Sequence, residues 1–107
     1  MVVDIRLPQE WEETGILPDS LLLTFFDEFG EINPEFLPKI KENFSPNDEI
    51  VLICRSARRT KFAIKFLKNH GFKNVRDIEG GILRLIAQNV CLEKFEPQGK
   101  TPNNAQN

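Results

Sequence analysis

Short apolar runs alternate with amphipathic stretches along most of the chain. The clearest run is Ile-Val-Leu-Ile at residues 50–53, which is apolar at every position and lies between polar segments. A continuous run of this length is typical of a strand that is buried on both faces of a parallel sheet. Shorter runs at residues 2–5, 21–24 and 74–78 predict three further strands, and we expect the strand at 21–24 to be buried as well.

Stretches with helical spacing lie between these runs. Residues 7–15 predict a short helix, with Pro8 in its first turn and Gly15 at its end. A second helix follows Asn33, and its apolar positions are Phe36, Leu37, Ile40 and Phe44. Pro38 lies inside that stretch. We expect a kink there, because a proline clashes with the carbonyl group four residues earlier.

A third helix is predicted from residue 58 to residue 70, directly before a glycine that can cap its C-terminus. Its spacing predicts a buried side that consists of Phe62, Ala63, Phe66 and Leu67. A fourth helix is predicted at residues 82–89, after a double glycine. Strands that alternate with helices through short connections favour an α/β domain, with a mostly parallel central sheet and helices on both faces. We expect this domain to span residues 1–96 and to be followed by a disordered tail, 97–107.

The composition excludes several classes of function. A net charge of −2 over 107 residues gives no reason to expect nucleic acid as a partner. No apolar run approaches the roughly 20 residues of a transmembrane helix, and the first residues do not form a signal peptide. We therefore predict a cytoplasmic protein without a membrane partner. Two cysteines and one histidine cannot complete a structural zinc site, so neither a metal nor another cofactor is expected.

Cys54 follows the buried run directly, and Arg55, Arg58 and Arg59 come after it. Ligand sites in parallel sheets gather outside the carboxyl ends of the strands, which is where this thiol lies. The loop at residues 55–60 leads into a helix, so its N–H groups, the helix N-terminus and the arginines can all converge on the sulfur. Such surroundings favour a thiolate without a general base. The thiolate could accept a sulfane sulfur and pass it on.

Other roles for the cysteines stay open. A cysteine after an apolar strand is often inert packing, and this alternative applies to Cys54. A disulfide between Cys54 and Cys91 is disfavoured in a reducing compartment. Cys91 lies among Val90, Leu92 and Phe95, so we expect a packed thiol. Its alternative role is a resolving thiol that takes sulfur from Cys54.

Several segments in a fixed order carry a further pattern. They are D-I-R-L-P-Q-E-W at 4–11, T-G-I-L-P-D-S at 14–20, I-V-L-I-C-R-S-A-R-R-T at 50–60, G-F-K-N-V at 71–75 and E-G-G-I at 79–82. In order and spacing these segments resemble the motifs of the single-domain rhodanese family of sulfurtransferases. An ordered set of this kind is far more specific than the cysteine loop alone.

The resemblance implies a rhodanese-type sulfurtransferase in which Cys54 forms a persulfide. The sulfur would come from a small donor such as thiosulfate or from a persulfide, and would go to a thiol or to cyanide. The implied substrate-binding loop consists of Arg55, Ser56, Ala57, Arg58, Arg59 and Thr60. Asp4 and Arg6 match a framework motif and are assigned structural roles, with Arg6 in an ion pair with Glu10 or a neighbour.

The chain departs from the family at two places. Ala57 stands where the family usually has glycine, and a left-handed backbone costs alanine more. We therefore expect an altered loop, or one shifted toward helix. The family usually has a strand and a helix before the first motif, whereas three residues precede Asp4 here. This N-terminal shortening would leave apolar surface uncovered, which predicts a homodimer or low stability.

Two other functions remain open at this point. One is a rhodanese-like module that binds or regulates a partner with little turnover. The other is a cysteine phosphatase, whose loop places the arginine six positions after the cysteine. Position 60 is a threonine and the arginine is Arg59, so the loop is one residue shorter and fits phosphate less well.

Overall fold

Strands and helices alternate along residues 1–96, which are the residues that the computed structural model describes. In chain order the elements are β1 (Val2–Asp4), α1 (Pro8–Thr14), β2 (Leu21–Leu22), α2 (Phe36–Asn43), β3 (Glu49–Ile53), α3 (Arg59–Asn69), β4 (Asn74–Asp77) and α4 (Gly81–Ala87). The predicted succession of strands and helices is confirmed. The predicted disordered tail, 97–107, lies outside the described residues.

The four strands form one parallel sheet in the order β2-β1-β3-β4. The most apolar strand, β3, is central, and its register places Leu52 beside Val3 of β1. The prediction of a buried strand at 21–24 is only partly right, because β2 is a two-residue edge strand that is half-buried. Beyond β2 the chain still pairs with β1 through Leu23 and Phe25, whose N–H groups donate to backbone carbonyls at 3.0 and 3.1 Å.

The main hydrophobic cluster lies on one face of the sheet, while Val51 and Ile53 of β3 are buried on the opposite face. Alternation along β1 and β3 points Val3, Ile5, Ile50, Leu52 and Cys54 to the same side, where α2 and α3 cover them. The helices contribute Phe36, Ile40, Ala63 and Leu67, each fully buried. Burial of each of the three large side chains, Phe36, Ile40 and Leu67, contributes roughly 1.5–3 kcal/mol. The sulfur of Cys54 therefore lies at the end of the main hydrophobic core.

Two expectations about the helices are wrong. Pro38 does not kink a helix, because α2 begins at Phe36 and its third residue needs no N–H partner. Phe62 is 63% exposed although helical spacing predicted that it is buried. The reason is the rotation of α3, which turns Ala63 and Leu67 toward the sheet and leaves Phe62 at the side. There its ring centroid lies 5.8 Å from that of Phe26.

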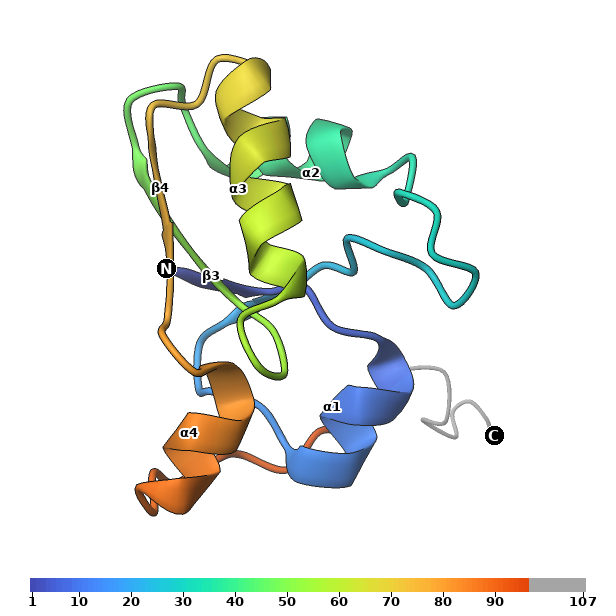
Figure 1. Cartoon of the computed structure of the whole chain (residues 1–107), viewed down its shortest axis with the longest axis vertical. Helices are drawn as coiled ribbons and strands as arrows, with labels where there is room; N and C mark the ends of the chain where they lie inside the picture. Colours follow the sequence, from blue (N-terminus) through green and yellow to red (C-terminus); the bar gives the residue numbers. More distant parts are fainter. Residues whose placement is uncertain (97–107) are drawn as a thin grey trace, which may run out of the picture.

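The helices α1 and α4 lie at the end of the molecule where α3 begins (Figure 1). Two contacts agree with this placement. The N–H of Ile82 in α4 donates to the carbonyl of Cys54 at 2.9 Å. Arg59 at the start of α3 forms an ion pair with Glu10 of α1 at 2.7 Å. The segment between β3 and α3 therefore lies between two helices that are far apart in the sequence.

Candidate active site

Cys54 ends β3 at the carboxyl edge of the sheet, as the sequence predicts, and it is 1% exposed. The loop that follows turns its first carbonyls toward α4. The oxygens of Cys54 and Arg55 accept hydrogen bonds from the N–H groups of Ile82 and Leu83 at 2.9 and 3.1 Å. The N–H groups of residues 55–58 have no hydrogen-bond acceptor within residues 1–96. The loop thus keeps donors that an anion next to the sulfur could use.

Ala57 adopts a left-handed backbone, with φ at +67°. The expectation that alanine shifts this loop toward helix is therefore wrong, since α3 begins only at Arg59. The left-handed region brings the Cβ of an L-residue close to its own carbonyl oxygen, which costs roughly 1–2 kcal/mol. The conformation that suits glycine is retained, and the alanine bears the strain.

The double glycine before α4 supports the same loop. Gly81 has φ at +63°, and a Cβ placed on it would lie 2.5 Å from the carbonyl oxygens of Cys54 and Arg55. Only a residue without a side chain lets the N-terminus of α4 approach so closely. In the sequence the double glycine predicts a turn and belongs to one of the segments that resemble the family. The structure shows that it holds the Cys54 loop against α4.

Arg59 does not extend into open space. Its two terminal nitrogens donate to the two carboxylate oxygens of Glu10 at 2.7 and 2.8 Å. Burial alone would raise the pKa of Glu10, but the hydrogen bonds from Arg59 and from the N–H of Leu7, together with the charge of Arg59, outweigh it and lower that pKa. The pair ties the start of α3 to α1. Arg55 and Arg58 are exposed and have no ion-pair partner within residues 1–96.

The hydroxyl of Thr60 contacts both the sulfur of Cys54 and the carboxylate of Asp77. Its Oγ1 donates to Oδ2 of Asp77 at 2.6 Å and lies 3.8 Å from Sγ of Cys54. Nζ of Lys61 donates to the same Oδ2 at 2.9 Å. Burial acts to raise the pKa of Asp77, but the hydrogen bonds from Thr60 and Lys61 and the lysine charge lower it below its usual range. Sequence analysis missed Asp77, although it ends a strand adjacent to β3 at the edge of the sheet where sites form.

Asp4 and Arg6 form a buried pair, with exposures of 0% and 1%. Nε and one terminal nitrogen of Arg6 donate to the two Asp4 oxygens at 2.9 and 2.8 Å. The other acceptors are Oγ1 of Thr14 and the carbonyls of Gly15 and Glu10. The Glu10 carboxylate, which sequence analysis offered as a partner of Arg6, instead binds Arg59.

The second cysteine and the histidine lie elsewhere. Cys91 is exposed, so the prediction of a packed thiol is wrong. The neighbouring Val90 is 39% exposed, because the chain leaves the end of α4 there without entering the core. His70 follows α3 directly, and its Nδ1 lies 2.8 Å from the carbonyl oxygen of Phe66. Within residues 1–96 neither residue forms a hydrogen bond with the Cys54 loop.

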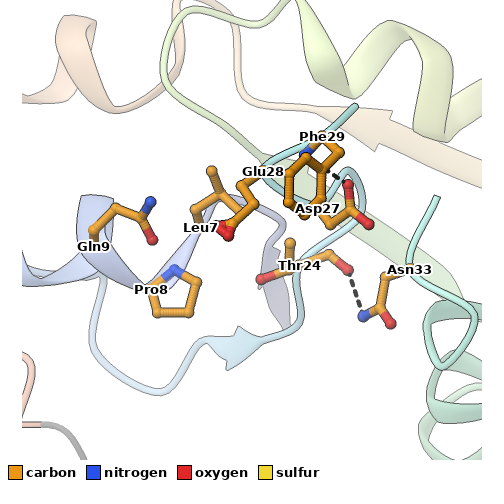
Figure 2. A pocket seen from close by; sticks show the side chains of 8 residues that line it. All are labelled: Leu7, Pro8, Gln9, Thr24, Asp27, Glu28, Phe29 and Asn33. Carbon is orange, nitrogen blue, oxygen red and sulfur yellow. Dashed lines mark hydrogen bonds between the residues drawn. The ribbon is translucent and has the colours of Figure 1, made fainter. Parts of the chain in front are cut away.

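A separate pocket of about 420 Å³ opens beside α1. Figure 2 shows its lining, which comes from the segments after β1 and β2: Leu7, Pro8, Gln9, Thr24, Asp27, Glu28, Phe29 and Asn33. The amide of Asn33 donates to the carbonyl of Thr24 at 2.9 Å and braces one wall. Cys54 and its loop do not line this pocket, so the pocket and the thiol are distinct features.

Residues 1–96 contain neither a metal-binding cluster nor a membrane-spanning helix. Three or more histidine, cysteine, aspartate or glutamate side chains do not gather anywhere in that part of the chain in a way that could hold a metal ion. None of the helices described there is long and apolar enough to cross a membrane.

Comparisons with known proteins match most of the chain. A family model described as Rhodanese-like domain matches residues 1–88. Rhodanese-like domain-containing protein 17 of Arabidopsis thaliana is 42% identical over 88 residues, which cover 78% of this chain and 56% of that protein. A protein named sulfurtransferase from Allochromatium vinosum is 33% identical over 84 residues, which cover 78% of this chain and 68% of that protein.

A solved structure shares the fold. The rhodanese-like domain of the Alr3790 protein from Anabaena sp. has a TM-score of 0.67 to this chain at 15% identity, and the match covers 83% of this chain and 81% of that domain. At this level of identity the likeness concerns the fold. Because the chain spans only about half of the Arabidopsis protein, what that whole protein does is not carried over to it.

Proposed function

This chain belongs to the family of rhodanese-like domains, and we propose that it is a sulfurtransferase that works through a persulfide on Cys54. The sulfur would come from thiosulfate or a persulfide donor and go to a thiol or to cyanide. The observation that best supports this is the loop after β3. That loop follows the thiol directly, and the N–H groups of its residues 55–58 have no acceptor within residues 1–96. Relatives named sulfurtransferase agree with this chemistry.

The proposed reaction has two transfers. The Cys54 thiolate attacks the outer sulfur of thiosulfate, a bond forms between the two sulfurs, and sulfite leaves with the electron pair of the broken bond. In the second transfer an acceptor thiolate or cyanide attacks the outer sulfur of the persulfide. The Cys54 thiolate then leaves with the electron pair and is ready for another donor. The loop N–H groups stabilise the negative charge on the outer sulfur.

Charge on the loop would favour an anionic donor. Arg55 and Arg58 belong to the loop that follows Cys54, are exposed and lack ion-pair partners within residues 1–96. Arg59 contributes less net charge, because the Glu10 carboxylate binds it with two hydrogen bonds. The attraction of thiosulfate is therefore assigned to Arg55 and Arg58, while Arg59 fixes the position of the loop.

A second function is favoured by the burial of the sulfur. Cys54 is 1% exposed, so a donor reaches it only after the loop moves. A domain whose loop stays closed would bind a partner without transferring sulfur, which is the binding or regulatory module. The two functions therefore differ in whether Cys54 accepts sulfur.

The test is the intact mass of the purified protein after exposure to thiosulfate and, separately, to a small persulfide. We expect the wild type to gain the mass of one sulfur atom and to lose it on addition of cyanide. Cys54→Ser should show no gain. Cys91→Ser should behave as the wild type, because Cys91 is exposed and is not part of the loop. A folded wild type that gains no sulfur from either donor would overturn the transfer function and leave the binding module.

A further inference from the structure

We propose that Asp77 is a positioning residue that holds the proton of Thr60 away from the sulfur of Cys54 and so favours the neutral thiol over the thiolate. This inference rests on the proposed sulfur transfer, because it assigns what sets the reactivity of the thiol in that reaction. It concerns a carboxylate on β4 that does not itself contact the sulfur in the structure.

The Thr60 hydroxyl has one proton, so it can donate either to Asp77 or to the sulfur, but not to both. An ionised carboxylate can only accept. At 2.6 Å from Oδ2 of Asp77, Oγ1 of Thr60 donates that proton to Asp77. The contact of 3.8 Å between Oγ1 and Sγ of Cys54 then requires the S–H group to be the donor. A thiolate at the same place would face a lone pair of Thr60, and two electron-rich atoms would repel each other.

Burial strengthens the effect of whether Thr60 donates its proton to Asp77 or to the sulfur. Cys54 is 1% exposed and Thr60 is fully buried, so water is largely excluded as an alternative donor to the sulfur. A hydrogen bond in such surroundings is electrostatically stronger than one in water. Lys61 donates to the same oxygen of Asp77 at 2.9 Å and helps to keep Asp77 ionised. Asp77 therefore remains an acceptor for the Thr60 proton across the neutral range.

The other charged groups around the site do not take over the effect of Asp77 on the protonation of the sulfur. On α3, Arg59 favours the thiolate, but its partner on α1, Glu10, offsets much of its charge. On β1, the buried Asp4 and Arg6 neutralise each other. In α4 the exposed Arg84 lies 3.6 Å from Glu79, and on the loop Arg55 and Arg58 are exposed to solvent, which screens their charges. Asp77 with Lys61 is the pair that reaches the sulfur through a single hydroxyl.

The consequence is a choice between two hydrogen bonds. When Thr60 turns its proton from Asp77 to the sulfur, the hydroxyl stabilises the thiolate or the persulfide anion. Each return to Asp77 favours the protonated thiol. Removal of the Asp77 carboxylate should therefore release Thr60 to the sulfur and increase the fraction of thiolate at a given pH.

The thiolate can be titrated directly through its ultraviolet absorbance. The chain contains two cysteines and no tyrosine, so in a Cys91→Ser background the thiol signal comes from Cys54 alone. In that background we expect Asp77→Ala to lower the midpoint of the titration by about one pH unit, which is about a tenfold increase in the ratio of thiolate to thiol. Asp77→Asn keeps an uncharged acceptor for Thr60 and should give a smaller shift. It also supplies the measurement if Asp77→Ala does not fold.

Thr60→Val separates the hydroxyl from simple charge effects. If Asp77 acts through Thr60, the shift caused by Asp77→Ala should largely disappear when Thr60→Val is present. An equal shift in both backgrounds would mean that the charge of Asp77 acts through space, and the proposal would be wrong. No shift in a folded Asp77→Ala or Asp77→Asn protein would overturn it as well. The titration uses no sulfur donor, so its outcome is independent of whether Cys54 forms a persulfide.

Discussion

Two loops leave neighbouring strands at the same edge of the sheet. They differ in whether their polar groups have hydrogen-bond partners within the protein. After β1, every N–H of the Arg6 side chain has an acceptor, and the residue is 1% exposed. After β3, Arg55 and Arg58 are exposed, and the N–H groups of residues 55–58 have no acceptor within residues 1–96. The same residue type is closed into the framework in one loop and available to a ligand in the other.

The difference separates structural arginines from functional ones. A buried ion pair gains little net stability, because the loss of hydration offsets most of the attraction. Its value lies in geometry, since Arg6 joins β1 to the end of α1 through Thr14 and Gly15. N–H donors without acceptors, as in the loop after β3, would destabilise a purely structural loop. Next to a nucleophile they can instead bind an anionic substrate. Glu10 links the two loops, since it follows the first and binds Arg59 at the end of the second.

The largest expected effect comes from breaking the buried ion pair in the loop after β1. Arg6→Met leaves the buried carboxylate of Asp4 without its charged partner and with only the backbone N–H of residue 6 as a donor. We expect a loss of about 3–5 kcal/mol in the free energy of unfolding, measured in urea. The double variant Asp4→Leu with Arg6→Met removes both charges and should recover part of that loss. If Arg6→Met costs less than 1 kcal/mol, the buried pair does not fix the framework.

The next effect concerns the support of the open loop. Gly81→Ala places a methyl group 2.5 Å from the carbonyl oxygens of Cys54 and Arg55, and we expect a loss of roughly 2–3 kcal/mol together with a displaced loop. Gly30→Ala is the matched control. Gly30 has φ at +81° and nothing within 4 Å of the new methyl group, so it bears only the left-handed strain, about 1 kcal/mol. Equal losses in the two variants would show that α4 does not press on the loop.

A smaller and pH-dependent effect comes from the link between the loops. Glu10→Gln weakens the contact with Arg59, and we expect a loss of about 1 kcal/mol near neutral pH. The pKa of Glu10 is lowered in the folded state from its ordinary value of 4.5. The stabilisation is therefore present above pH 4.5 and is lost as the pH falls below it. Urea unfolding of both proteins across this range should show the two curves converging in acid. A constant difference between them would argue against the ion pair.

Much of this comparison could be predicted from the sequence. The run at 50–53 predicts a buried strand because every position is apolar, and the end of such a strand places Cys54 at the site-forming edge. The framework role expected for Asp4 and Arg6 agrees with their buried contact. Local patterns were sufficient here because each feature depends on residues that are close together in the chain.

The remainder depends on contacts between distant residues. Asp77 meets Thr60 across 17 positions, and Glu10 meets Arg59 across 49. Only the packing of α3 against β4 and α1 brings these groups together, so spacing along the chain carries no direct signal for them. The prediction that Phe62 is buried was wrong for a related reason. Helical periodicity defines a face, but the neighbouring elements decide which edge of that face is covered.

The smallest effect tests the strain that the open loop bears. Ala57→Gly relieves the left-handed backbone but increases the freedom of the unfolded chain, so we expect a net gain of roughly 0.5–1 kcal/mol in the free energy of unfolding. Ala87→Gly at the end of α4 is the matched control, because the same change at a right-handed helical position should instead cost about 0.5–1 kcal/mol. The signs should therefore be opposite. If both variants lose stability, the left-handed turn at residue 57 is not a source of strain, and the loop after β3 is as relaxed as the loop after β1.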